Sequence, residues 1–276
     1  MARLSISKAW DETRALLSRN GKLMTTVAAA MFLLPQVIVG VITGQGTDAS
    51  ETAPALGLPI FLIAAIIGVV GQLAIAWLAI GTGISVGESI RHGLRRTLPF
   101  IGAFLLMIAA FVIFFVIAAG LLMALGVVDA TVAQPRPGDV IIILLIMLVP
   151  MLFVAVRMLP SVAVAVATAE PQGPIGILRR SWTLTSGHFG RLLGFFLVFV
   201  LAALIVAVTV TLVSGLLVSV LFGSTEPFSI GALVLSLLVG LLQVALILVY
   251  VVMIARIYVQ LAGGGAAEAS VPTTGS

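Results

Sequence analysis

Residues 177–196 read ILRRSWTLTSGHFGRLLGFF, a basic and polar stretch that runs directly into a long apolar segment. A related stretch, GLRRTLPFIGAFLL, occupies residues 93–106 and also precedes an apolar segment of membrane length. Both stretches contain, in the same order, a leucine, two arginines, a hydroxyl residue and a large apolar residue. We therefore expect short basic segments to alternate with membrane-spanning segments along the chain.

The composition of the 276-residue chain is that of an integral membrane protein. Apolar residues make up 61% of the chain, charged residues only 9%, and the mean hydropathy is +1.30. Soluble domains contain roughly 25% charged residues, and a soluble core could not hide so much apolar surface. The chain has no cysteine, which excludes disulfides and thiolate metal sites.

Six apolar stretches are long enough to cross a membrane as helices. A helix needs about 20 mostly apolar residues to span about 30 Å of hydrocarbon. Pro35 and Pro150 lie inside two of these stretches, and each removes a backbone donor, so we expect kinks there. The predicted spans are residues 23–42, 56–83, 99–126, 140–168, 192–222 and 230–261.

The connections between the predicted spans alternate in charge. The N-terminal segment and the connections 84–98 and 170–191 are rich in Lys and Arg, whereas the other connections hold Arg136 alone among several acidic residues. Basic residues accumulate on the cytoplasmic side of a membrane. We therefore predict a multi-pass protein of the cell membrane, of the bacterial inner-membrane type, with both termini in the cytoplasm.

Each of the three basic segments has apolar residues at helical spacing, which predicts an amphipathic helix lying in the membrane interface. In the second segment, Ser85 and Glu88 also fit a capping box at the helix start. The apolar positions are Ile6, Trp10 and Leu17 in the first segment, Val86, Ile90, Leu94 and Leu98 in the second, and Ile175, Leu178 and Trp182 in the third.

The predicted fold is all-α, a polytopic integral membrane protein with six transmembrane helices in three repeated units. Each unit begins with a cytoplasmic interfacial helix and continues with two spans. The units cover about residues 4–83, 84–169 and 170–262 of a single membrane domain at 1–262. Residues 263–276 are small and polar, and we predict a flexible tail there.

Residues 140–200 resemble a known membrane domain. Arg157 and Pro160 lie at the end of a predicted span, and Glu170 and the run RSWTLTSG at 180–187 follow. This pattern resembles the membrane domain of some glycerophosphoryl diester phosphodiesterases, which also occurs alone in small six-span bacterial membrane proteins. The resemblance implies a membrane architecture without catalytic residues. In that family the chemistry belongs to a soluble barrel of about 250 residues, and no such stretch is present here.

Five arginines in the basic connections are candidates for binding anionic lipid headgroups or another phosphate-bearing ligand. The alternative is that they only orient the chain by the positive-inside rule and contact headgroups in a generic way. The candidates are Arg91, Arg95, Arg96, Arg179 and Arg180.

Four further polar residues lie inside the apolar stretches. An arginine at a helix centre costs about 2.5–3.5 kcal/mol, so Arg157 either faces protein or a wet cavity, or snorkels to the headgroups. Arg256 is nearer the end of its span, where snorkelling is favoured. Gln72 and Gln243 fall near mid-membrane, where they either line a polar path or hydrogen-bond neighbouring helices.

The sequence predicts no enzymatic chemistry. His92 and His188 lack a partner arrangement for general-base catalysis, and the His-Glu-x-x-His motif is absent. We therefore expect a non-enzymatic scaffold or accessory protein that contacts membrane lipids, anionic ones in particular, or a partner protein at the cytoplasmic face. No metal, cofactor or nucleic acid is expected. The alternative is a transporter or channel for a lipid or small molecule, in which Arg157, Gln72 and Gln243 would face one another along a polar path.

Overall fold

The computed structural model describes residues 4–43, 54–126, 137–167, 173–223, 226 and 228–263. All regular secondary structure within them is helical, and six helical stretches are long and apolar enough to cross a membrane, which confirms the predicted class. In chain order the elements are α1 (Ile6–Ala28), the π-helical turn η1 (Ala29–Leu33), α2 (Leu34–Thr43), α3 (Pro54–Ile80), α4 (Val86–Ala124), α5 (Pro137–Met158), α6 (Ser161–Ala167), α7 (Pro174–Thr185), α8 (Phe189–Phe222) and α9 (Ile230–Leu261). Arg136 and residues 264–276 of the predicted tail lie outside the described residues.

The predicted interfacial helices of the first two basic segments are not confirmed as elements of their own, although both segments are helical. Each of these segments continues without a break into its span, through η1 in one case and along α4 in the other. Only the third segment forms a helix of its own, α7. The difference lies in the turn that follows α7, where Ser186 is extended and Gly187 has a φ of +83°, a conformation that favours glycine.

Local sequence signals explain the helix starts and distortions. The predicted capping box is present at the start of α4, where Ser85 Oγ accepts from Glu88 N at 3.3 Å and Glu88 Oε2 accepts from Ser85 N at 3.0 Å. Before Pro35, the backbone widens into the π turn, in which Leu34 N donates to Ala29 O. This widening relieves the clash of a proline ring with the preceding turn.

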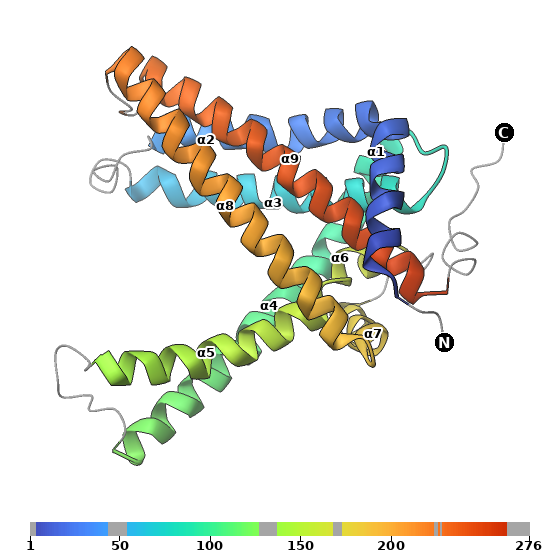
Figure 1. Ribbon diagram of the computed structural model, residues 1–276, viewed down its shortest axis with the longest axis vertical. Helices are drawn as coiled ribbons and strands as arrows, with labels where there is room; N and C mark the ends of the chain where they lie inside the picture. The colour runs from blue at the N-terminus through green and yellow to red at the C-terminus, as the bar shows by residue number, and fades with distance from the viewer. Residues whose placement is uncertain are drawn as a thin grey trace.

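The buried core lies at one end of the molecule, where α1, α3, α6 and α9 pack together. Residues 73–80 of α3 and 163–167 of α6 are almost fully buried there. Away from this end, α4 and α5 diverge from α2, α3, α8 and α9, so that the molecule has two arms arranged as a V (Figure 1). Much of α4, α5 and α8 exposes large apolar side chains, as expected of helices that face lipid.

Helices α3 and α4 meet closely near the buried end. Ser89, Gly93, Arg96 and Thr97 share one buried face of α4. A Cβ atom on Gly93 would lie only 2.8 Å from the carbonyl oxygen of Val70 in α3. The absence of a side chain at position 93 therefore allows the two backbones to touch.

Each basic segment contains a buried threonine whose hydroxyl donates to the carbonyl four residues earlier. The bonds are Thr13 to Ala9 at 2.7 Å, Thr97 to Gly93 at 2.9 Å, and Thr185 to Ser181 at 3.0 Å. Such a bond satisfies a buried hydroxyl without help from another helix. The repetition of the three predicted units stays a prediction, because Thr97 corresponds to Ser181 and not to Thr185 in the two matching stretches.

Candidate functional site

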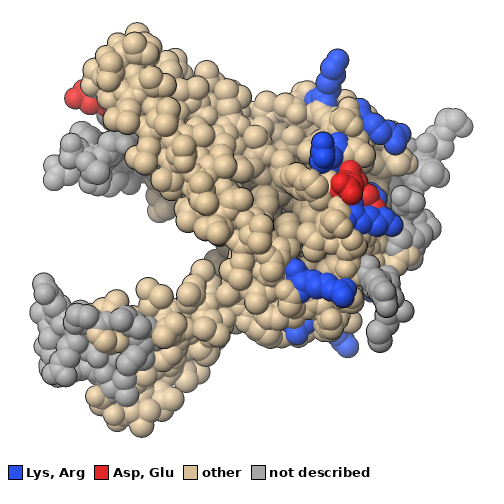
Figure 2. Space-filling view, in the orientation of Figure 1, with Lys and Arg blue, Asp and Glu red and all other residues tan. Residues whose placement is uncertain are grey.

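Lys and Arg side chains gather at the end of the molecule that contains the core, opposite the tips of the two arms (Figure 2). We call this the basic end. Four of the five arginines predicted to bind headgroups are exposed in α4 and α7, which pack against each other. These four are Arg91, Arg95, Arg179 and Arg180.

Arg96 does not belong to this exposed set, contrary to the prediction. The residue is only 6% exposed, because it lies on the face of α4 that the fold buries. Arg96 and Arg95 are adjacent in the basic segment. Adjacent residues on a helix point about 100° apart, however, so one can face solvent while the next faces the core.

Arg157 lies against an aromatic cluster formed by α5, α7 and α8. Its Cζ atom is 5.3 Å from the ring centroid of Phe153, 5.1 Å from that of Trp182 and 5.7 Å from that of Phe189. A guanidinium at these distances is attracted to each ring face, by about 0.5–2 kcal/mol. We call Arg157 and these three aromatic residues the Arg157 cluster.

Hydrogen bonds fix the Arg157 cluster to the end of α7. Arg157 Nη1 donates to the Trp182 carbonyl at 3.4 Å and to Ser186 Oγ at 3.2 Å, and Ser181 Oγ donates to the Arg157 carbonyl at 2.8 Å. Arg157 therefore contacts protein, whereas its snorkelling to the headgroups stays a prediction. Its buried Nε atom and the buried Nδ1 atom of His188 have no hydrogen-bond partner within the described residues.

Arg256 forms an ion pair with Glu12 of α1, an arrangement that the sequence analysis did not predict. Arg256 Nε lies 2.9 Å from Glu12 Oε2, and both side chains are mostly buried. Lys8 Nζ lies 3.9 Å from the same carboxylate group. The pair ties α1 to α9 across 244 residues of sequence, a separation over which helical periodicity carries no signal.

The two glutamines are not joined to Arg157. Gln72 is half-buried on α3, whereas Gln243 is exposed on α9. The hydrogen bonds and ring contacts of Arg157 involve α5, α7, α8 and the turn between the last two. Within the described residues, no hydrogen bond links these three polar side chains, and the transporter alternative, in which they face one another along a polar path, stays a prediction.

The side chain of His92 packs against two neighbouring helices. Its ring stacks on that of Trp77 with centroids 4.0 Å apart, and its Nε2 donates to the Val166 carbonyl at 3.1 Å. These contacts join α4 to α3 and α6. In the part of the chain that the structure describes, no group of three or more His, Asp or Glu residues could hold a metal.

Six helical stretches of membrane length and a basic end define a multi-pass membrane protein. The chain matches the family described as a domain of unknown function, DUF7847, over residues 4–261, and it therefore belongs to that family. No curated protein and no solved structure matches the chain. The resemblance to the membrane domain of glycerophosphoryl diester phosphodiesterases stays a prediction, because the family match does not assign that relationship.

Proposed function

We propose that this protein is a non-enzymatic membrane protein that binds anionic lipid headgroups at the cytoplasmic face of the bacterial inner membrane. The observation that supports this proposal best is the set of four exposed arginines at the basic end, contributed by α4 and α7. Each Lys or Arg near an anionic surface contributes about 1 kcal/mol to binding. Trp182, which is 42% exposed in the same region, is of a residue type typical of the headgroup level.

The direction of the chain supports the cytoplasmic orientation of the basic end. Helix α1 begins and α9 ends at this end of the molecule (Figure 1). Arg14, Arg19 and Lys22 of α1 add further positive charge to the arginines of α4 and α7. By the positive-inside rule, the basic end then faces the cytoplasm and the anionic lipids of that leaflet.

Neutralising the four exposed arginines, as R91Q/R95Q/R179Q/R180Q, is expected to lower the anionic lipid retained by the protein at least about tenfold, since each charge contributes about 1 kcal/mol. The measurement is native mass spectrometry of the protein released from its own membranes in minimal detergent. A second variant neutralises Arg14, Arg19 and Lys22 of α1 at the same end, and it is expected to lose less lipid than the four-arginine variant, because these residues lie outside the surface formed by α4 and α7.

Unchanged retention in the four-arginine variant, or a mixed lipid population that ignores the substitutions, would contradict the proposal. The arginines would then serve only to orient the chain. A protein that carries a second polypeptide and no lipid would point instead to a partner protein at this face.

A further inference from the structure

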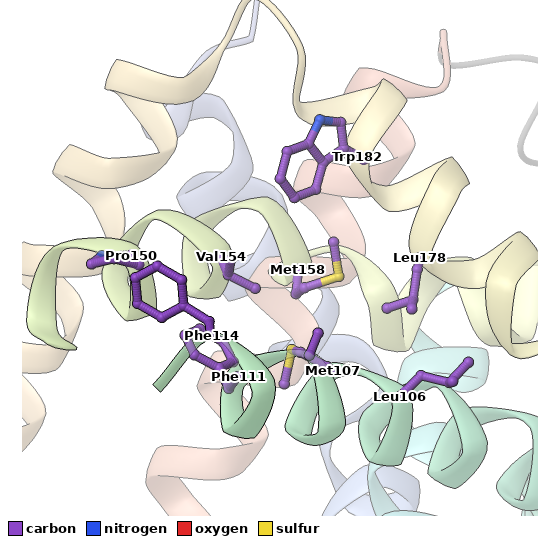
Figure 3. A pocket seen from close by; sticks show the side chains of 10 residues that line it. Leu106, Met107, Phe111, Phe114, Pro150, Val154, Met158, Leu178 and Trp182 are labelled. Carbon is purple, nitrogen blue, oxygen red and sulfur yellow. The ribbon is translucent and has the colours of Figure 1, made fainter. Parts of the chain in front are cut away.

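A groove with almost entirely apolar walls runs between α4 and α5. Its central part has a volume of about 330 Å³, which lies at the small end of ligand sites in proteins, roughly 300–1,000 Å³. Side chains from the two helices point toward one another across it (Figure 3). They include Met107, Phe111 and Phe114 of α4 and Pro150, Val154 and Met158 of α5.

The groove continues in both directions along α4. A smaller cavity that begins at Phe100 shares Met107 and Met158 with the central part, and another begins at Phe115 on the far side. From Phe100 to Phe114 a helix rises about 20 Å. One leaflet of a bilayer contributes about 15 Å of hydrocarbon. This section is therefore long enough to accompany an acyl chain through one leaflet.

Helix α7 closes the groove at the basic end. Leu178 and Trp182 line the groove there. Trp182 also belongs to the Arg157 cluster, whose guanidinium has a buried Nε atom with no hydrogen-bond partner among the residues that the structure describes. The groove thus ends at Trp182, whose ring centroid lies 5.1 Å from the guanidinium carbon of Arg157. Apolar walls followed by a cation match the polarity of a phospholipid with its acyl chain in the groove and its phosphate at the end.

We propose that the α4–α5 groove binds one acyl chain of an anionic phospholipid, whose phosphate lies beside Arg157. This inference rests on the proposed function and gives the bound lipid a defined place. The groove is concave and two-sided, and methionine at its centre adapts to a flexible chain. The outer surface of a single helix such as α8 offers neither feature.

Filling the groove with A110W tests the proposal, because Ala110 lines its central part. The matched control is A109W, which adds the same ring at the next position, where the exposed Ala109 does not line the groove. Delipidated protein is titrated with dioleoyl phosphatidylglycerol, and bound lipid is counted by native mass spectrometry. A110W is expected to bind about tenfold more weakly, as follows from loss of contact with about two methylenes, and A109W as tightly as the unchanged protein.

Equal binding by A110W and A109W would overturn the proposal. A lipid-free dimer of the unchanged protein that A110W dissociates would also overturn it, since a second copy would then occupy the groove. Comparing A110W with the four-arginine variant distinguishes this inference from the proposed function. If the four-arginine variant loses binding and A110W does not, headgroup binding is supported and the groove proposal is contradicted. If A110W loses binding and the four-arginine variant does not, the groove is supported and the four arginines are not the lipid site.

Discussion

Gly93→Leu is expected to prevent α4 from docking onto α3, so that little folded protein is recovered from the membrane. A Cβ atom at position 93 would lie 2.8 Å from Val70 O and 3.1 Å from Ala74 N. Both are backbone atoms inside α3, so neither can move aside without disturbing that helix. Even Gly93→Ala is expected to lower the free energy of unfolding by about 1–3 kcal/mol, the usual cost of overpacking.

The control for this prediction is Gly87, one turn and a half earlier on the same helix. A Cβ atom at position 87 would meet nothing within 4 Å, so Gly87→Ala and Gly87→Leu should fold normally. Thermal unfolding in detergent, followed by circular dichroism and by size-exclusion chromatography, compares the four variants. If Gly93→Leu melts like the unchanged protein, the two backbones do not touch at this position.

Glu12→Ala is expected to destabilise the protein by about 2 kcal/mol, because it leaves a mostly buried arginine without its partner carboxylate. In the structure, Arg256 Nε donates to Glu12 Oε2 at 2.9 Å, and this pair joins the first and last long helices. The cost lies below the 3–5 kcal/mol typical of fully buried pairs, because the side chains of Arg256 and Glu12 remain 17% and 25% exposed.

Replacing both residues tests whether the stability lost in Glu12→Ala comes from the unpaired charge of Arg256 or from the missing glutamate side chain. The double variant Glu12→Leu and Arg256→Met is expected to recover most of the stability, since apolar residues of similar volume often replace buried ion pairs without cost. Asp11→Ala, which removes an exposed carboxylate next to Glu12, is the charge-matched control. A melting temperature that Glu12→Ala leaves unchanged would mean that the ion pair does not hold α1 to α9.

The sequence was sufficient for features that depend on local signals. Mean hydropathy and segment length predict the six spans, and Ser85 with Glu88 predicts the start of α4. The break between α7 and α8 also has a local cause, since Gly187 adopts a left-handed conformation. The first two basic segments contain no such turn, which is why they continue into their spans.

Features that depend on contacts between distant segments could not be predicted in this way. The burial of Arg96 depends on which face of α4 meets its neighbours, and the ion pair of Arg256 depends on how α1 crosses α9. Along the apolar parts of α4 and α5, apolar residues surround the helix on all sides. Periodicity therefore does not distinguish the surface that faces lipid from the surface that forms the groove.

Lipid selectivity tests the central claim most directly. Delipidated protein would be mixed with equal amounts of dioleoyl phosphatidylglycerol and dioleoyl phosphatidylcholine, which share their acyl chains and differ in headgroup charge. Native mass spectrometry then gives the ratio of the two bound lipids. Recognition by the exposed arginines predicts that phosphatidylglycerol exceeds phosphatidylcholine at least about tenfold. Equal binding of the two lipids would contradict anionic headgroup recognition at the basic end.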